Sequence, residues 1–398
     1  MERIFFHIDV NSAFLSWSAI KMLEDGADYD LRTIPSIIGG DSSKRHGVVL
    51  AKSIPAKKFH IITGEPVVNA FRKCPFLVTA PPDHEFYNTK SHELMTFLSN
   101  ICPDIEQVSV DECYMDYTPI AGKYPSPETA AEHIKNQVKE RFGYTVNVGI
   151  SDRKVLAKMA SDFKKPDLVH TLYKREIKNK MWPLPVSSLY MCGKSSVDAL
   201  HKLEILTIGD LANADPDILL SHLKSHGRQL WEYANGIDDT PVITEPEQHK
   251  GIGNSTTLSR DAVTREDALL PLRALADSVG KRLRESSQLA GMVNVEIKYN
   301  TFKTVSHQTT LTTPTNSSDM IFKIACELFD KIWDKTPIRL LGIRTAKLQD
   351  SDTPIQLNLF EMHASNPVSQ KQQKLDNALD SIRSKYGENA IIRGSFLK

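Results

Sequence analysis

Three acidic side chains are the residues of this 398-residue chain whose types and spacing best suit catalysis. Asp9 follows a β-branched and aromatic run at residues 4–8, and Asp111 and Glu112 follow the segment Val-Ser-Val at 108–110. Aromatic and β-branched residues favour strands, so each carboxylate is expected at a rigid strand end. A lone Asp-Glu pair is most often a solvated turn. A carboxylate in a buried strand, however, must be paired, protonated or bound to a metal ion, so a cation site is the better interpretation.

Carboxylates placed in this way predict phosphoryl or nucleotidyl transfer. Mg²⁺ takes one or two carboxylates from a protein and completes its shell with water and substrate phosphates. Of two ions, one would lower the pKa of an attacking hydroxyl and the other would neutralise charge on the leaving pyrophosphate. Neighbouring side chains on a regular strand point to opposite faces. Asp111 and Glu112 can therefore share a site only if the chain turns or bulges between them.

Length and composition predict a soluble enzyme of several domains, because a chain of this length exceeds the size at which one core stops growing. Its five cysteines show no Cys-x-x-Cys spacing, which argues against a zinc site or a disulfide framework and fits a reducing cytoplasm. The first apolar run is too short for a signal peptide, and no stretch approaches a membrane span. We therefore expect a cytoplasmic protein, and a monomer.

Basic charge is concentrated in one part of a chain whose net charge is zero. Residues 250–348 hold fifteen Lys and Arg against ten Asp and Glu, whereas residues 236–249 hold four acids and no Lys or Arg. Phosphate binding depends on local charge, so a nucleic-acid partner remains compatible with the neutral total. The acidic, proline-bearing residues 236–249 are typical of a linker.

Beyond this linker the pattern predicts a β-α-β-β-α-β unit. Apolar side chains alternate with polar ones in its second strand, so helices should cover one sheet face while the polar face could lie along a duplex groove. The predicted elements are strand 254–258, helix 265–287, strands 293–299 and 302–310, helix 319–333 and strand 339–348. Candidates for phosphate contact are Arg260, Lys298, Lys303, Arg344 and Lys347.

Four ordered motifs resemble the Y-family DNA polymerases, the lesion-bypass enzymes related to bacterial DNA polymerase IV and the catalytic subunit of polymerase V. They are His-Ile-Asp at 7–9, Ser-Val-Asp-Glu at 109–112, Val-Gly-Ile-Ser at 148–151 and Phe-Lys-Lys-Pro at 163–166. The resemblance implies template-directed addition of deoxynucleotides to a primer 3′ end, translesion synthesis of low fidelity, and no proofreading.

The resemblance also implies the α+β fold of a right-hand polymerase. The expected parts are a palm at 1–20 and 76–166, fingers at 21–75, a helical thumb with a helix-hairpin-helix at 167–235, the linker at 236–249, a little finger at 250–348 and a tail at 349–398.

The family pattern assigns site residues by position. Asp9, Asp111 and Glu112 would be catalytic and, with the backbone carbonyl of Val10, would bind two Mg²⁺ ions. Phe14 stands at the steric-gate position that excludes ribonucleotides. The nucleotide-binding positions are Asn11, Ser12, Ala13, Phe14, Ser53, Lys57 and Lys165, and the last matches the triphosphate-binding lysine.

Three residues beside the expected nucleotide depart from that pattern: Ala51 replaces a hydroxyl residue, Ile54 a tyrosine and Lys57 an arginine. Lys57 cannot form the bidentate fork of a guanidinium group. Fewer donors should raise KM unless Lys52 or Lys58 compensates, so we expect an active but inefficient polymerase.

In the expected thumb, Gly193 and Lys194 would hold a DNA phosphate, and Met191 and Glu204 stand where the family has glycine. A plain pair of packed helices fits this segment about equally well.

The tail holds the peptide Gln356-Leu357-Asn358-Leu359-Phe360, which resembles the motif that binds the sliding clamp. Gln356 would contact one rim of an apolar pocket that Leu359 and Phe360 fill, and Leu357 is a further clamp-binding position. A segment buried on the protein itself is the alternative. A further helix is expected around Leu379.

Two other classes of function remain open. Another nucleotidyl transferase with a palm, such as a cyclase or primase, would share the acids without needing the basic module. A non-catalytic accessory protein would not need all three acids together. Their joint presence favours the polymerase.

Overall fold

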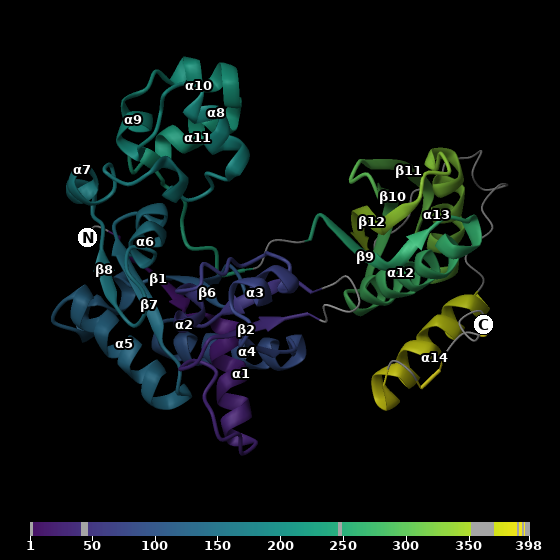
Figure 1. The fold of residues 1–398 in the computed structure, drawn as a ribbon, viewed down its shortest axis with the longest axis horizontal. Coiled ribbons are helices and arrows are strands. Elements are labelled where there is room, and N and C mark those ends of the chain that lie inside the picture. The colour runs from purple at the N-terminus through teal and green to yellow at the C-terminus, as the bar shows by residue number, and fades with distance from the viewer. Residues whose placement is uncertain are drawn as a thin grey trace. The chain divides into compact units, whose positions relative to one another are not determined.

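The structure is a computed structural model that describes residues 3–40, 47–245, 249–351, 370–387, 390–391 and 394. The chain forms two units, residues 1–42 with 47–246 and residues 43–46 with 247–398 (Figure 1). The predicted clamp-binding peptide at 356–360 lies outside the described residues. In the part of the chain that is described, no helix has the length and apolar character needed to cross a membrane.

A five-stranded sheet forms the centre of the first unit, in the order β5-β6-β1-β7-β8. Its strands are β5 (Ile105–Gln107), β6 (Glu112–Asp116), β1 (Phe5–Val10), β7 (Val146–Ser151) and β8 (Val169–Thr171). All neighbouring pairs are antiparallel except β7 and β8. The two strands beside β1 are therefore the ones that can bring side chains next to Asp9.

The two faces of this sheet carry different side chains. Phe6, Ile8 and Val10 of β1 enter the main core, which α4 (His84–Ile101) and α5 (Pro127–Phe142) cover. Ser126 caps α5 with Pro127 as its first residue, as predicted. Side chains alternate along a strand, so the odd-numbered residues of β1, Asp9 among them, lie on the opposite face.

The opposite face carries α6 (Lys154–Ser161), which packs against β1 and β7 (Figure 1). Gly149 on β7 permits this close approach. A Cβ atom there would lie 2.0 Å from the carbonyl oxygen of Ala157 and 2.5 Å from the backbone nitrogen of Ser161. The glycine of the Val-Gly-Ile-Ser motif thus allows the helix to lie directly on the strand.

The fingers are built on a three-stranded sheet in the order β3-β2-β4. Its elements are β2 (Ser36–Gly39), β3 (Val49–Lys52), α2 (Ile54–Lys57), α3 (Val67–Lys73) and β4 (Val78–Ala80), and α1 (Ala13–Glu24) connects β1 to this part. The predicted boundary at residue 76 assigns β4 to the palm. The structure instead pairs β4 in parallel with β2, so this strand belongs to the fingers sheet.

Short helices follow the palm in the predicted thumb. They are α7 (Ile177–Lys180), α8 (Lys194–His201), α9 (Ile208–Asn213), α10 (Pro216–Leu223) and α11 (Ser225–Ala234), with 3-10 turns at 174–176 and 186–188. A further 3-10 turn, at 118–123, follows β6 in the palm. Leu200, Leu211, Leu219 and Leu230 are fully buried between them. Most of the predicted range 167–235 is helical, as expected, but residues 169–171 within it form β8 of the palm sheet.

Part of the predicted linker lies against the palm. Asp238 accepts a hydrogen bond from the backbone nitrogen of Val155 at 2.9 Å, and Lys154 donates to the carbonyl oxygen of Pro241 at 3.0 Å. The backbone nitrogen of Ile243 donates to Glu106 at 2.8 Å. Residues 238–243 are therefore held by the first unit.

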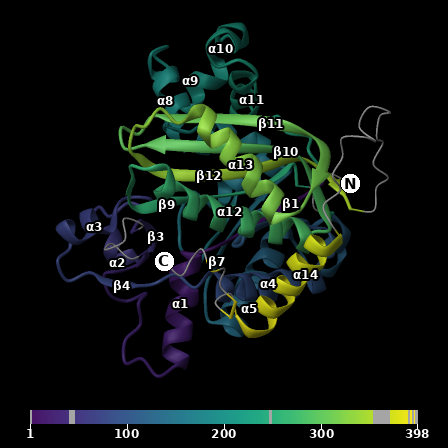
Figure 2. The ribbon, with the colours of Figure 1, turned by 90° about the vertical axis from the view of Figure 1, so that its right-hand side faces the viewer.

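The second unit has the predicted β-α-β-β-α-β order. Its elements are β9 (Gly251–Ala262), α12 (Arg265–Glu285), β10 (Gln288–Tyr299), β11 (Thr304–Thr315), α13 (Ser318–Ile332) and β12 (Ile338–Asp350), and the strands form an antiparallel sheet in the order β11-β10-β12-β9. Figure 2 shows α12 and α13 against one face. Val293, Val295 and Ile297 are fully buried beneath them, as their alternation predicted.

The helix expected around Leu379 is α14 (Gln370–Tyr386). Arg284 on α12 forms ion pairs with Asp380 at 2.6 Å and Asp376 at 3.7 Å, so this helix docks on the second unit.

The strand predicted at residues 108–110, which the structure describes, does not form. Residues 108–110 form a bend rather than a buried strand, and Val108 is 42% exposed. The buried strand is β6, which begins at Glu112 and places Cys113 and Met115 in the core. The second acidic pair thus lies at the beginning of a strand and not at the end of one.

Candidate active site

Asp9 and Glu112 lie directly opposite each other on β1 and β6, in an antiparallel register that also pairs Ile8 with Cys113. Opposite residues of an antiparallel pair share one face, so both carboxylates lie on the face that carries α6. Their side chains are 15% and 22% exposed. The carboxylates of Asp9 and Glu112, which are about a hundred residues apart in the sequence, therefore lie next to each other at a half-buried position.

Asp111 satisfies the requirement that the chain turn before Glu112. It lies in the bend that precedes β6, and its carbonyl oxygen accepts a hydrogen bond from the backbone nitrogen of Val10 at 2.9 Å. The hydroxyl of Ser109 donates to the Asp111 carboxylate at 2.6 Å. Burial, together with the charges of Asp9 and Glu112, raises the pKa of Asp111.

Two lysine ammonium groups neutralise the acidic pair. Lys158 on α6 lies 2.7 Å from Glu112 and 3.3 Å from Asp9, and Lys165 lies 2.9 Å from Asp9. Both lysines also pair with Asp162, at 3.4 and 2.9 Å. Burial alone would lower the pKa of Lys158, but the negative charges of Asp9 and Glu112 raise it above its usual value.

His7 forms the buried side of the cluster. Its Nδ1 lies within hydrogen-bond distance of the Ser161 hydroxyl, at 2.8 Å, and its Nε2 lies 3.4 Å from Glu112. Burial lowers the pKa of His7. His7 and Lys158 together lower the pKa of Glu112 to about 2, so this carboxylate is ionised at neutral pH.

The side chains fit a divalent cation. Donor atoms of His7, Asp9 and Glu112 lie within 4.8 Å of one another, and this is the group of that kind found among the described residues. Carboxylate oxygens are the ligands that Mg²⁺ prefers. Asp111 lies outside this group but close enough for both carboxylates to shift its pKa. The roles of Asp111 and of the Val10 carbonyl as ligands stay predictions.

A pocket between palm and fingers adjoins the cluster. Its lining includes several of the predicted nucleotide-binding residues, and the residues are Asn11, Ser12, Leu15, Ser16, Arg32, Ser53, Ile54, Lys57, Thr145, Lys165 and Pro166. Arg32 is held by Asp30 and donates to the carbonyl oxygen of Gly143 at 2.7 Å. Lys57 and Lys165 are thus the lysines placed beside this space.

The predicted compensation by Lys52 or Lys58 has little structural support. Lys52 donates to the carbonyl oxygen of Ile61 at 2.5 Å, and neither lysine lines the pocket. The departures at Ile54 and Lys57, by contrast, face it directly.

Ser53 and Asn11, two of the predicted nucleotide contacts, also form hydrogen bonds within the protein. The Ser53 hydroxyl accepts from the backbone nitrogen of Ala56, which caps α2, and donates to the carbonyl oxygen of Ile34. The Asn11 side chain is buried and hydrogen-bonds within the palm. Both residues still border the pocket.

Ala13 and Phe14 lie at the beginning of α1 and do not line the pocket. Ala13 is buried in the core. The ring of Phe14 stacks on Tyr87 with centroids 4.5 Å apart, so it is held rigidly but half-buried. Its steric-gate role stays a prediction.

In the thumb, Gly193 caps α8 and Lys194 begins that helix. Met191 and Glu204 adopt positive φ angles of 67° and 61°. These are the two positions where the family pattern has glycine, so the backbone keeps a glycine-like conformation although the side chains differ.

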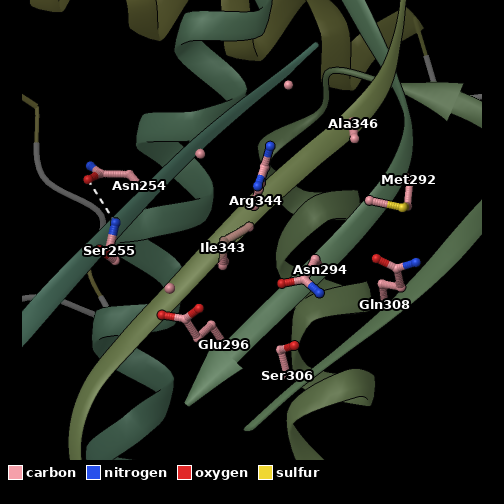
Figure 3. Close-up of a pocket in the computed structure, with 13 residues that line it drawn as sticks. Asn254, Ser255, Met292, Asn294, Glu296, Ser306, Gln308, Ile343, Arg344 and Ala346 are labelled. Atoms are coloured by element: carbon pink, nitrogen blue, oxygen red, sulfur yellow. Dashed lines mark hydrogen bonds between the residues drawn. The ribbon is translucent and has the colours of Figure 1, made fainter. Parts of the chain in front are cut away.

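The polar face of the second unit is hollowed along β9, β10, β11 and β12 (Figure 3). Figure 3 shows Asn294, Ser306, Gln308 and Arg344 on this face together with Glu296. Lys298 lies over the ring of Phe302, Arg260 pairs with Asp267 at 3.5 Å, and Lys303 is exposed. Of the five predicted phosphate contacts, Arg344 is the one that lines the hollow.

Sequence reasoning assigned no role to Lys158. A signal was available, because Lys158 is a charged residue within the largely apolar sequence of α6 and has Asp162 four residues later. A buried cation needs carboxylate partners, and the acids predicted at the palm site were candidates for that role.

Comparisons with known proteins identify the family of this chain. Residues 8–162 match the impB/mucB/samB family and residues 249–359 match the C-terminal domain of that family. A relative from Clostridium acetobutylicum, described as DNA polymerase IV, is 44% identical over all of this chain and 99% of its own length. A Bacillus subtilis relative, DNA polymerase IV 1, is 36% identical over all of this chain and 94% of its own.

A solved Y-family DNA polymerase chimera shares the fold, with a TM-score of 0.76 at 21% identity. The match covers 89% of this chain and 100% of the chimera. The chain therefore belongs to the impB/mucB/samB family, the Y-family DNA polymerases, and has their α+β right-hand fold.

Proposed function

We propose that this chain extends a DNA primer on a template by two-metal-ion nucleotidyl transfer. The observation that carries the proposal is the pairing of Asp9 with Glu112, with Asp111 in the adjoining bend, beside a pocket bordered by Lys57 and Lys165. The relatives described as DNA polymerase IV support it.

The chain's own residues supply binding and electrostatics. Asp9, Asp111 and Glu112 would hold two Mg²⁺ ions, and those ions would activate the primer hydroxyl and neutralise the pyrophosphate. Lys165 is within reach of both the Asp9 carboxylate and the pocket, so it would exchange a carboxylate partner for a triphosphate oxygen.

The remaining predictions complete the proposal. The hollowed sheet face would lie along the duplex, and Gly193 and Lys194 would contact a phosphate. Synthesis would be of low fidelity, would lack proofreading and would bypass lesions. A sliding clamp would raise the local primer concentration through residues 356–360. The enzyme would act as a cytoplasmic monomer.

Primer extension tests the proposal. The purified chain should extend a primer on damaged and undamaged templates with Mg²⁺ and deoxynucleotides, and EDTA should stop the reaction. A clamp should stimulate extension only while residues 356–360 are present. Failure to extend any primer at millimolar deoxynucleotide would refute the proposed activity.

A further inference from the structure

A buried amide network joins the palm sheet to the loop that follows α6. Asn147 on β7 is fully buried, and its Nδ2 donates to the carbonyl oxygens of Ser161 at 3.1 Å and Lys164 at 2.6 Å. Its Oδ1 accepts from the Asn11 side chain at 3.2 Å and from the backbone nitrogen of Leu168 at 3.3 Å. An asparagine has two donor hydrogens and two acceptor positions, so this side chain is fully used.

Asn11 extends the network from the end of β1. Its Oδ1 accepts from the backbone nitrogen of Asp167 at 2.9 Å and from the Thr145 hydroxyl at 2.9 Å. The two asparagines therefore hold backbone atoms of residues 164, 167 and 168. Lys165 lies between these anchored points.

Other contacts share in holding this loop. His170 Nε2 lies 3.0 Å from the carbonyl oxygen of Lys164, and the carbonyl oxygen of Leu168 accepts from the backbone nitrogen of Val148 at 3.0 Å. Asp167 pairs with Lys135 at 3.1 Å and with Lys139 at 2.7 Å. These ion pairs act on the side chain of Asp167 and not on its backbone amide. The pair with Lys139 is mostly exposed, so it adds little stability. The backbone amide of Leu168 is left to Asn147.

We propose that Asn147 is a positioning residue for the incoming nucleotide. By holding the backbone on both sides of Lys165, it keeps that ammonium group 2.9 Å from Asp9, at the border of the pocket. A long lysine side chain can be placed accurately only if its backbone is fixed, and small displacements of a charged group weaken binding strongly. The inference rests on the proposed function, because it assigns Lys165 to the triphosphate.

Two variants separate the positioning role from bulk packing. Asn147→Ala removes the whole amide, whereas Asn147→Asp keeps the shape and both acceptors but sets a carboxylate oxygen against the carbonyl oxygens of Ser161 and Lys164, so it repels the anchored backbone. Ser151→Ala is the matched control. Ser151 is also fully buried on β7 and donates to a backbone carbonyl at 2.6 Å, but that carbonyl belongs to Leu172.

Steady-state kinetics on the full chain give the first readout. Both Asn147 variants should raise the KM for deoxynucleotide about tenfold, change kcat less, and leave the Kd for primer-template DNA within about twofold. Ser151→Ala should leave KM unchanged even if it unfolds at a lower temperature. Equal KM values for wild type and the Asn147 variants, or an equal rise in Ser151→Ala, would overturn the inference.

Amide hydrogen exchange gives a second readout that needs no activity. Exchange at the amide of Leu168, which donates to Asn147, should accelerate in Asn147→Ala, and exchange at Asp167 should accelerate less, because its acceptor Asn11 loses one partner. Both amides should stay slow in Ser151→Ala. Unchanged exchange at both amides in Asn147→Ala would contradict the anchoring. If the wild-type chain extends no primer but the variants differ in exchange as described, the proposed function is refuted while the anchoring by Asn147 is established.

Discussion

The ammonium group of Lys158 and the carboxylate of Glu112 form a 2.7 Å ion pair on the sheet face that also carries Asp9. Lys158 is 12% exposed and also contacts Asp9, so it offsets repulsion between two half-buried carboxylates. A cation bound at this point would supply the same offset from the solvent side.

Replacing Lys158 tests this balance. Lys158→Met should lower the free energy of unfolding by about 3 kcal/mol in EDTA, because it leaves buried carboxylates unpaired. Mg²⁺ should restore part of the loss and raise the Tm of the variant more than that of the wild type. Urea and thermal unfolding with and without Mg²⁺ measure both effects.

A surface pair provides the control for that variant. Lys21 pairs with Asp83 at 2.7 Å, but both side chains are 42% exposed. Lys21→Met should therefore lower the free energy of unfolding far less than Lys158→Met does, with no dependence on Mg²⁺. Equal decreases in the free energy of unfolding for the two variants would show that the buried ion pair stabilises the fold no more than a surface pair does.

Lys57 offers a gain of function. Because it lines the pocket and stands where the family pattern has arginine, Lys57→Arg should lower the KM for deoxynucleotide by roughly threefold through a bidentate contact. Lys58→Arg, at an exposed position off the pocket lining, should have no effect. A KM that is the same in both variants would mean that residue 57 does not reach the phosphates.

The thumb hairpin contains removable backbone strain. Glu204 is exposed and has a φ of 61°, a conformation that costs a residue with a Cβ about 1 kcal/mol or more. Glu204→Gly should raise the free energy of unfolding by about 1 kcal/mol. Lys202→Gly should lower it, because Lys202 has an ordinary helical φ of −65°. Urea unfolding decides, and a destabilised Glu204→Gly would contradict the assignment.

Cysteine reactivity tests the palm core. Burial raises the pKa of the Cys113 thiol to about 12, so it should resist alkylation at pH 8 while the half-buried Cys326 reacts. Unfolded chains ionise this thiol near its ordinary pKa, so Cys113 should make the fold less stable as pH rises from about 9 towards 12. Labelling of Cys113 before unfolding would contradict the observed core.

The sequence predicted parts of this fold whose signals are local. Alternation of Val293, Val295 and Ile297 gave the second sheet and its buried face, and the Ser126–Pro127 cap gave the beginning of α5. Val108 and Val110 misled the prediction, because β-branched residues also occur in bends when tertiary contacts determine the backbone.

The site was predictable only where residue type limits the chemistry. The carboxylates of Asp9 and Glu112 were predicted to share a cation site, and the structure places them side by side. Lys158 contacts Asp9 from 149 positions away in the chain. The contacts of Asn147 with Ser161, Lys164 and Leu168 span only 14 to 21 positions, but they depend on the approach of the loop after α6 to β7. The charge of Lys158 within α6 indicates a carboxylate partner without saying which one, whereas the neutral Asn147 carries no such signal.

Single-nucleotide incorporation at saturating deoxynucleotide and Mg²⁺ tests the central claim most directly. Glu112→Gln keeps the shape of the side chain but removes its charge, so it should lower kcat by at least about a hundredfold. Asp116→Asn, at the far end of β6, should retain a kcat close to that of the wild type. A Glu112→Gln enzyme that incorporates nucleotides as fast as Asp116→Asn would contradict metal-dependent transfer at this site.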